Sequence, residues 1–462
     1  MPKNSSAARR GPWVLALDVG SSSVRAQLYG AGGQPLADAP AAQVPVRWRT
    51  DPPGAMETDA HALVRAALTA LDRGVKAARA AQLEIAAVGS DTFWHGVMGV
   101  AADGSAVTPL YAWGDTRARE DAAALRERVD ADAAHTRTGC FVHESYPAAR
   151  LVWLRRIMGD TFPRAAGWLS IGEHLGERLF GVRRTSRSMA SGTGLMDVRA
   201  CRWDDEMLAA CGVTAGVLPE LSDEPMTGMR PEFARRWPEL ASVPWFPALG
   251  DGACATLGSG AAGPGRIALT VGTSAAVRVL RDDAEPRVPP QLWLYRLDAA
   301  RTVGGRALSN AGNTMAWMRR TLRLPRADRL EAALAEIGDA PPPPLEIVPV
   351  LLGERPPLSE RGDVATIAGM TMSTTPVEIW RAWLWALARR IAEAVEVVER
   401  EYGRAAEIVA SGGALHASPA FRAILERSLA RPLHLRGGHG DETARGAALM
   451  ALGRLGVDSL RP

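Results

Sequence analysis

The chain has 462 residues, a formal net charge of +3 and a hydrophobic content of 47%. This length is too great for one compact core and predicts two or three domains. The small, evenly spread charge disfavours nucleic acid as a partner. The sequence has no apolar run of about 18 residues, so no membrane span is predicted.

Two residue types narrow the chemistry further. Lys3 and Lys76 are the only lysines, and neither belongs to a G-x-x-x-x-G-K-[ST] pattern, so a Walker-type phosphate loop is excluded. The four cysteines are far apart and have no CxxC spacing. That pattern argues against a zinc site or a disulfide framework and favours a reducing cytoplasm. The polar segment 1–12 is expected to be a disordered tail.

The first predicted element is an apolar strand that ends in a carboxylate. Residues 13–30 read WVLALDVGSSSVRAQLYG, so Asp18 is followed by Gly20, Ser21, Ser22 and a second strand. Small residues in this place are typical of a hairpin turn. They also fit a turn that receives phosphate, because glycine lets the backbone approach a ligand and successive amides bind anions.

A helix is predicted over residues 59–81, followed by a buried strand over residues 83–90. The strand ends in DTFWHG. Ligands in α/β folds lie beyond the carboxyl ends of the strands, so Trp94 and His95 are placed to reach a cleft. Both residue types are also common in structural roles.

The next stretch contains two candidate functional carboxylates. In YAWGDTRARE, Asp115 is expected to cap a helix, and together with Arg117 it forms either a structural ion pair or part of the cleft. The region 120–245 is mostly helical by pattern. Asp251 follows in GDGACATLGSG, with a glycine on each side that lets a substrate approach the carboxylate; the plainer alternative is an Asp-Gly turn.

The opening pattern then occurs a second time. Residues 265–280 read GRIALTVGTSAAVRVL, and IALTVGTSA aligns with LALDVGSSS, so Gly272 corresponds to Gly20. Two such turns facing each other across a cleft can bind a polyphosphate from both sides. Asp18 corresponds to Thr270 in the second copy, and one carboxylate is enough to hold magnesium, often through water. The repeat predicts two related α/β domains.

The last part of the chain adds three signals. Asn313 follows a glycine at the start of a predicted helix. The longest helix is expected to begin with the capping box TPVE at residues 375–378 and to stop near Gly403. Gly412 and Gly413 follow a strand, where a glycine pair lets the backbone lie flat against a ring such as adenine.

In this order the motifs resemble those of the FGGY family of carbohydrate kinases, from about Val14 to Leu452. ALDVGSSSVRA resembles the first phosphate motif, and LTVGTSA resembles the second. FWHGVMGVAADGSAVTPLYAWGDTR resembles the sugar-side segment, GDGACATLGSG the segment with the catalytic aspartate, and ASGGALHASP the adenine motif. TFWHG, SMASGTGLMD, VGTSAAVRV, GRALSNAGNTMAWM and LLGERPP look like the gluconokinase branch.

The resemblance implies an α/β fold of two actin-like (ribonuclease H-like) domains, residues 13–256 and 257–462, with a deep cleft between them. It implies transfer of the ATP γ-phosphoryl group to a hydroxyl of a small sugar or sugar acid, above all D-gluconate. ATP and Mg²⁺ are the expected cofactors. The oligomeric state is left open, with a homodimer as one option.

The resemblance also implies roles for individual residues. Asp251 would be the general base and would bind the substrate, and Asp18 would hold Mg²⁺ through water. The expected phosphate donors are Gly20, Ser21, Ser22, Gly272, Thr273 and Ser274. The residues expected at ribose and adenine are Asn313, Gly412, Gly413 and Ala414. The further substrate candidates are Trp94, His95, Asp115, Arg117 and Tyr146.

Three alternatives remain. A kinase of a neutral sugar such as xylulose would share the fold, and a gluconate enzyme needs a partner for the carboxylate, for which Arg117, His95 and His143 are candidates. An actin- or chaperone-like ATPase would share both turns but would not need Asp251. A degenerate kinase acting as a sugar sensor is disfavoured because Asp18, Asp251 and both turns are intact.

Overall fold

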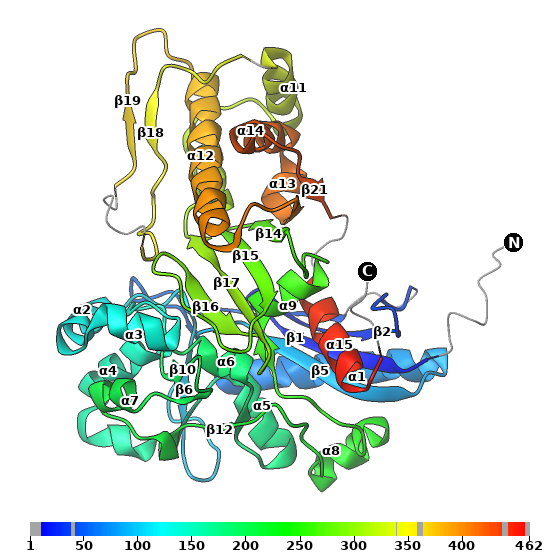
Figure 1. The fold of residues 1–462 in the computed structure, drawn as a ribbon. Helices are drawn as coiled ribbons and strands as arrows, with labels where there is room; N and C mark the ends of the chain where they lie inside the picture. The colour runs from blue at the N-terminus through cyan, green and yellow to red at the C-terminus, as the bar shows by residue number, and fades with distance from the viewer. Residues whose placement is uncertain (1–10, 38–41, 339, 358–363, 437–441, 458–462) are drawn as a thin grey trace, which may run out of the picture.

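The computed structural model describes residues 11–37, 42–338, 340–357, 364–436 and 442–457. The tail expected over residues 1–12 therefore lies almost wholly outside the described residues. The described chain forms two α/β halves, and the C-terminal half stands above the N-terminal half in Figure 1.

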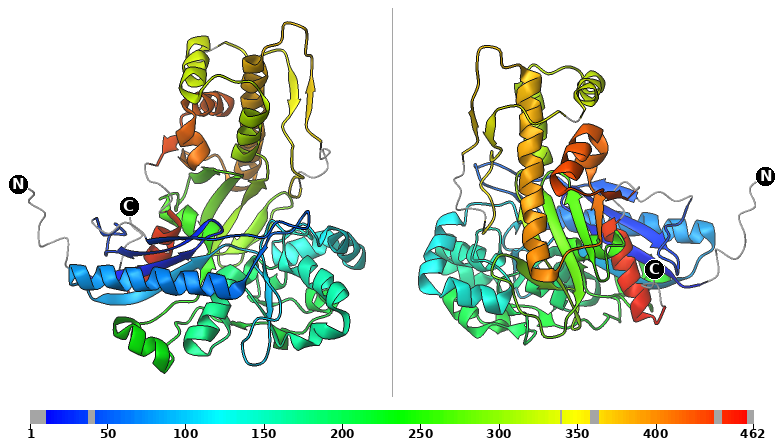
Figure 2. Two further views of the ribbon diagram at one scale, coloured as in Figure 1. Left: turned by 180° about the vertical axis from the view of Figure 1, so that it is seen from behind. Right: turned by 45° about the horizontal axis from the view of Figure 1, so that its top comes forward.

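The N-terminal half contains the first strand–turn–strand. Its sheet and covering helices are β1 (Trp13–Val19), β2 (Ser23–Tyr29), β3 (Ala42–Pro45), β5 (Ile85–Thr92), β13 (Leu249–Gly250), α1 (Ala60–Ala81), α9 (Asp251–Gly258) and α15 (Glu442–Arg454). The strand order is β13-β5-β1-β2-β3, with β1 antiparallel to β2 and parallel to β5. Helix α1 packs on one face, and α15, from the far end of the chain, packs on the other (Figure 2).

The C-terminal half repeats this arrangement. Its sheet and long helices are β14 (Arg266–Val271), β15 (Ala275–Asp282), β16 (Trp293–Arg296), β17 (Arg301–Leu308), β20 (Glu407–Ser411), β21 (His434–Leu435), α12 (Pro376–Tyr402) and α14 (Pro419–Leu429). The order is β16-β17-β15-β14-β20-β21, with β14 antiparallel to β15 and parallel to β20. The repeated strand–turn–strand is therefore confirmed.

Shorter elements fill the rest of both halves. In the N-terminal half they are β4 (Glu57–Thr58), β6 (Met98–Val100), β7 (Leu110–Tyr111), α2 (Arg119–Arg128), α3 (Ala131–Thr138), α4 (Pro147–Met158), β8 (Gly167–Leu169), α5 (Ile171–Phe180), β9 (Arg184–Thr185), α6 (Arg187–Ser191), β10 (Met196–Asp197), β11 (Arg202–Trp203), α7 (Asp205–Cys211), β12 (Glu220–Leu221) and α8 (Pro231–Arg236). In the C-terminal half they are α10 (Gly312–Thr321), α11 (Ala327–Ile337), β18 (Glu346–Val348), β19 (Thr366–Ala368) and α13 (Gly413–Ala417).

Local chemistry explains where the long helices begin and end. The Thr375 hydroxyl accepts a hydrogen bond from the Glu378 backbone, and the Glu378 carboxylate accepts one from the Thr375 backbone, which confirms the predicted capping box of α12. Gly403 follows the last residue of α12, as expected. Asp59 caps α1 by accepting hydrogen bonds from two backbone amides of its first turn.

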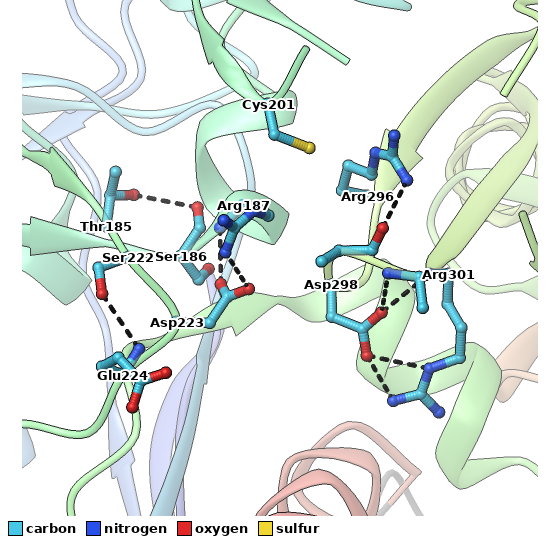
Figure 3. A network of polar contacts seen from close by, with 12 residues as sticks. Thr185, Ser186, Arg187, Cys201, Ser222, Asp223, Glu224, Arg296, Asp298 and Arg301 are labelled. Carbon is cyan, nitrogen blue, oxygen red and sulfur yellow. Dashed lines mark hydrogen bonds and ion pairs between the residues drawn. The ribbon is translucent and has the colours of Figure 1, made fainter. Parts of the chain in front are cut away.

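The two halves contact each other along β16. Arg296 is fully buried there, and its Nε donates to the Val198 carbonyl oxygen at 2.6 Å while its backbone nitrogen donates to the Ser191 hydroxyl at 2.9 Å. Figure 3 shows Arg296 close to the ion pair of Asp298 and Arg301. Because its hydrogen bonds join a strand of one half to the end of α6 and to the segment after β10 in the other half, Arg296 fixes the edge of the cleft.

All four cysteines are free thiols, which agrees with the absence of a disulfide framework expected from their spacing. Within the described residues, no helix is both long and apolar enough to cross a membrane.

Candidate active site

The two repeated turns face one cavity of about 510 Å³ between the halves. The turns follow β1 and β14, and the strand pairing leaves residues 20–22 and 272–274 to form them. The lining residues used below are Ser21, Ser22, Trp94, His95, Tyr146 and Asp251 from the N-terminal half, and Thr273, Ser274, Arg278, Trp293, Tyr295 and Arg355 from the C-terminal half. Eight of the predicted site residues therefore line one space, namely Ser21, Ser22, Trp94, His95, Tyr146, Asp251, Thr273 and Ser274.

Asp251 lies at the floor of this cavity as the first residue of α9. Its Oδ1 accepts hydrogen bonds from the backbone nitrogens of Gly252 at 2.8 Å and Trp94 at 3.3 Å. Burial raises the pKa of the Asp251 carboxyl above its usual 3.8, and the charge of Arg278 partly opposes that rise. A positioned carboxylate of increased basicity can accept a proton from a substrate hydroxyl.

The glycines beside Asp251 make room for Trp94. A Cβ on Gly250 would overlap the indole ring, and a Cβ on Gly252 would lie 2.6 Å from its Cζ3 atom. The Trp94 Nε1 donates to the Ser188 carbonyl oxygen at 2.9 Å, which fixes the ring. The small residues expected to admit a substrate therefore admit the indole ring, which holds the Asp251 backbone in place.

Aromatic side chains from both halves form a neutral wall. The Tyr146 and Tyr295 hydroxyls are 2.7 Å apart, and the Trp94 and Tyr295 ring centroids are 4.8 Å apart. The His95 Nδ1 is hydrogen-bonded to the Gly192 carbonyl oxygen. Burial lowers the pKa of His95 to about 3, so this imidazole is uncharged at neutral pH.

Asp115 and Arg117 form an ion pair away from the lining of this cavity. The Arg117 Nη2 lies 2.6 Å from the Asp115 Oδ2 and also pairs with Glu57. The predicted cap is wrong: α2 begins at Arg119, and Asp115 accepts a hydrogen bond from the Met56 nitrogen at 3.0 Å instead. A role of this pair in substrate binding stays a prediction.

Asp18 lies beside a second carboxyl group that the sequence pattern does not reveal. The register of β1 and β5 pairs Asp18 with Asp91, which is fully buried. Neither Asp91 carboxyl oxygen accepts a hydrogen bond from an ordinary donor of the described residues, and a protonated Asp91 can donate one to the Asp18 carboxylate. Burial, followed by the charges of Asp18 and Asp251, raises the pKa of Asp91 well above 3.8.

The groups at the first turn fit magnesium. Mg²⁺ typically binds through one or two carboxylates and completes its shell with water and substrate phosphates. The Asp18 Oδ1 lies 3.4 Å from where a Cβ on Gly20 would stand, so this carboxylate adjoins the first repeated turn, and Asp91 adds a second carboxyl beside it. Among the described residues, no group of three or more His, Cys, Asp or Glu could hold a metal by itself.

The second turn is fixed against α10. The Gly272 and Thr273 carbonyl oxygens each accept a hydrogen bond at 3.0 Å, from the backbone nitrogens of Gly312 and Asn313. The Asn313 Oδ1 accepts a hydrogen bond from the Ala311 nitrogen at 2.8 Å. The Asn313 side chain thus shapes the helix start, and its contact with a nucleotide stays a prediction.

The predicted adenine motif also lies against the second turn. Gly412 has a φ of 107°, and a Cβ there would overlap the backbone of Val271. A Cβ on Gly413 would meet nothing within 4 Å, whereas a Cβ on Gly312 would lie 3.4 Å from the Ala414 Cβ. Gly412 is therefore required by close packing, and the space beside Gly413 is open.

Sequence reasoning missed several lining residues, among them Arg278, Trp293, Tyr295 and Arg355. Arg278 stands four residues after Ser274 on the same strand face, and Trp293 and Tyr295 alternate in WLYR. Because side chains alternate between the two faces of a strand, the strand pattern could have identified Arg278, Trp293 and Tyr295. Arg355 lies in LLGERPP, whose loop offers no periodicity.

Comparison with known proteins agrees with this geometry. The N-terminal domain model of the FGGY family of carbohydrate kinases matches residues 13–258, and the C-terminal domain model matches residues 267–453. The chain belongs to the FGGY family of carbohydrate kinases. It is therefore an ATP-dependent kinase that acts on a carbohydrate or a carbohydrate derivative, and the interpretation as an ATPase switch is not supported.

FGGY kinases named for different substrates resemble this chain. A gluconokinase of Bacillus subtilis is 25% identical over 384 residues, covering 80% of this chain and 74% of its own. The gluconate kinase structure from Lactobacillus acidophilus has a TM-score of 0.86 at 23% identity and covers 97% of this chain and 90% of its own. The xylulose kinase structure from Lactobacillus acidophilus has the same TM-score at 24% identity with the same coverage. These structures confirm the actin-like fold and do not fix the substrate.

Proposed function

We propose that this FGGY kinase phosphorylates a sugar acid, D-gluconate, at the hydroxyl farthest from its carboxylate, giving 6-phosphogluconate. The observation that carries the proposal is the charge of the cavity. Its charged lining residues are Asp251, Arg278 and Arg355, because His95 is neutral. Two cations against one carboxylate favour an anionic substrate over a neutral sugar such as xylulose. The gluconokinase among the relatives supports the same substrate.

Asp251 accepts the proton of the substrate hydroxyl while the hydroxyl oxygen attacks the γ-phosphorus of ATP, and the bond from that phosphorus to the bridging oxygen breaks to release ADP. Phosphoryl transfer depends mainly on in-line positioning and on neutralised charge. The aromatic wall holds the carbon skeleton and excludes water, which limits wasteful ATP hydrolysis. The donors to the phosphates are the amides and hydroxyls of Gly20, Ser21, Ser22, Gly272, Thr273 and Ser274.

Asp18 would hold Mg²⁺ through water, and the bound ion would neutralise phosphate charge. Gly412, Gly413 and Ala414 would face the adenine ring, and the space beside Gly413 supports this assignment. The free cysteines fit the reducing cytoplasm that we propose as the compartment. A homodimer stays a prediction.

The test is ADP release by the purified protein with Mg-ATP and a panel of gluconate, other aldonic acids, xylulose, ribulose and glycerol. We expect gluconate to give the highest kcat/KM and mass spectrometry to show one added phosphate on the acid. A neutral sugar with the highest kcat/KM would keep the kinase assignment and overturn the assignment of gluconate.

A further inference from the structure

The groups first considered for a substrate carboxylate carry no available positive charge. The Arg117 guanidinium is paired with Asp115 and Glu57. His95 has a pKa of about 3 because it is buried. Burial likewise lowers the pKa of His143 to about 4, and its Nδ1 is hydrogen-bonded to the Ser145 hydroxyl. At neutral pH the cations that line the cavity are Arg278 and Arg355.

Arg278 lies beside the catalytic carboxylate with donors to spare. Its Nη1 is 3.3 Å from the Thr270 hydroxyl, and its Nε is buried with no hydrogen-bond partner in the described residues. A Cβ on Gly252, the residue after Asp251, would stand 3.1 Å from that Nε. Because this Nε has almost no accessible surface, an anion in the cavity would be met by the Nη atoms of Arg278.

Arg355 lines the same cavity from a loop of the C-terminal half. Its Cζ lies 4.8 Å from the centroid of the Trp113 ring, a cation–π contact with the N-terminal half. No carboxylate of the described residues pairs with it. Burial lowers the pKa of Arg278, and the charge of Arg355 adds to that lowering, so the two guanidinium groups repel each other. A bound anion would relieve that repulsion.

The loop that carries Arg355 is fixed in place. The neighbouring Glu354 is buried, and its Oε1 accepts a hydrogen bond from the Ser309 nitrogen at 3.1 Å while its Oε2 lies 3.3 Å from Arg390 Nη2. The Asn310 Oδ1 accepts hydrogen bonds from the backbone of residues 351 and 352, each at 2.9 Å. Arg355 therefore extends over the cavity from an ordered support, as a preorganised binding residue requires.

We propose that Arg278 and Arg355 together bind the carboxylate of a sugar-acid substrate and thereby select aldonic acids over neutral polyols. This inference rests on the proposed function of the cavity. Guanidinium groups suit the task because their planar donors match a carboxylate in a bidentate way. An anion held between them would also join β15, which carries Arg278, to the loop that carries Arg355.

The experiment compares D-gluconate with D-glucitol, in which an alcohol replaces the carboxylate, using the full chain with Mg-ATP. Arg278→Met and Arg355→Met remove each charge and keep an unbranched side chain. Arg287→Met is the matched control, since the Arg287 side chain is 83% exposed and does not line the cavity. The KM for ATP is measured for every variant, and Arg→Lys at each site serves if a Met variant does not fold.

We expect each Met variant to lower the ratio of kcat/KM for gluconate over glucitol by about 10- to 150-fold, the range for a hydrogen bond to a charged group. The KM for ATP and the control variant should change less than about twofold. An unchanged ratio in either variant overturns the inference, as does a higher KM for ATP with the ratio preserved, which would assign the arginines to the phosphates. Wild-type protein that uses a neutral sugar and not gluconate overturns the proposed function itself.

Discussion

Three carboxyl groups meet under the cavity, and each has different surroundings. Asp251 accepts two backbone hydrogen bonds, and Asp18 adjoins the first repeated turn. Asp91 lies beside Asp18 on the neighbouring strand, and among the described residues its carboxyl accepts no hydrogen bond from an ordinary donor and can donate one to Asp18 only when it is protonated. A buried carboxyl without donors is most stable when it is protonated.

We predict that Asp91→Asn stabilises the free protein at neutral pH. The folded state raises the pKa of Asp91, so above pH 3.8 the unfolded chain ionises while the folded chain keeps the proton. The free energy of unfolding of the wild type therefore falls as the pH rises, and the neutral amide of Asn, which has the same shape as the carboxyl, removes this loss. We expect a gain of about 1–3 kcal/mol in the free energy of unfolding at pH 7.5, measured by urea denaturation.

The gain should shrink as the pH falls toward 3.8, because the unfolded chain then takes up the proton that the folded chain keeps. Measurements at pH 4.5 and pH 7.5 therefore provide an internal control. A variant that is less stable than wild type at both pH values would contradict this account, because it would show that the carboxyl makes favourable interactions as an anion.

At the same scale, motif and spacing were enough to find Asp18, Asp251 and Trp94. They were not enough for Asp91 and Arg278, whose positions depend on which strands pair and in which register. For Arg117 the sequence left open a charge that is free for the substrate, whereas the structure pairs this charge with Asp115 and Glu57.

At the scale of elements, the strand–turn units fix the site. The backbone of the second turn packs against α10 and against the Gly412 turn at the start of α13. Periodicity predicted α1, α12 and both hairpins well, because each buries one clear apolar face. It could not show that α15 covers the N-terminal sheet, because α15 lies far from that sheet in the sequence and could have packed on another apolar surface.

Gly412→Ala should destabilise the protein by about 2 kcal/mol or more, because φ is 107° and the added Cβ would overlap the Val271 backbone. Gly413→Ala is the matched control, since its Cβ would meet nothing within 4 Å, and we expect a change of about 1 kcal/mol or less. Urea denaturation of both variants measures the difference. Equal stabilities would show that the turn is not packed as described.

At the scale of the whole molecule, the cavity exists only because two similar halves contact each other. Each half supplies one of the repeated turns, while Asp251 comes from α9, the helix that leads from one sheet to the other. Arg296 joins the halves at one edge, and α15 returns to the first sheet. The duplicated sequence motif predicted the two halves, but the side chains that β16 contributes to the cavity follow only from the assembled fold.

The central claim is that Asp251 is the general base for phosphoryl transfer in this cavity. The most direct measurement is sugar-dependent ADP release by wild type and by Asp251→Asn, with ATP binding measured in parallel by calorimetry. We predict that kcat falls by about 10²- to 10⁴-fold, the usual contribution of a general base, while the affinity for ATP is retained. Turnover by Asp251→Asn within a few-fold of wild type would contradict the claim.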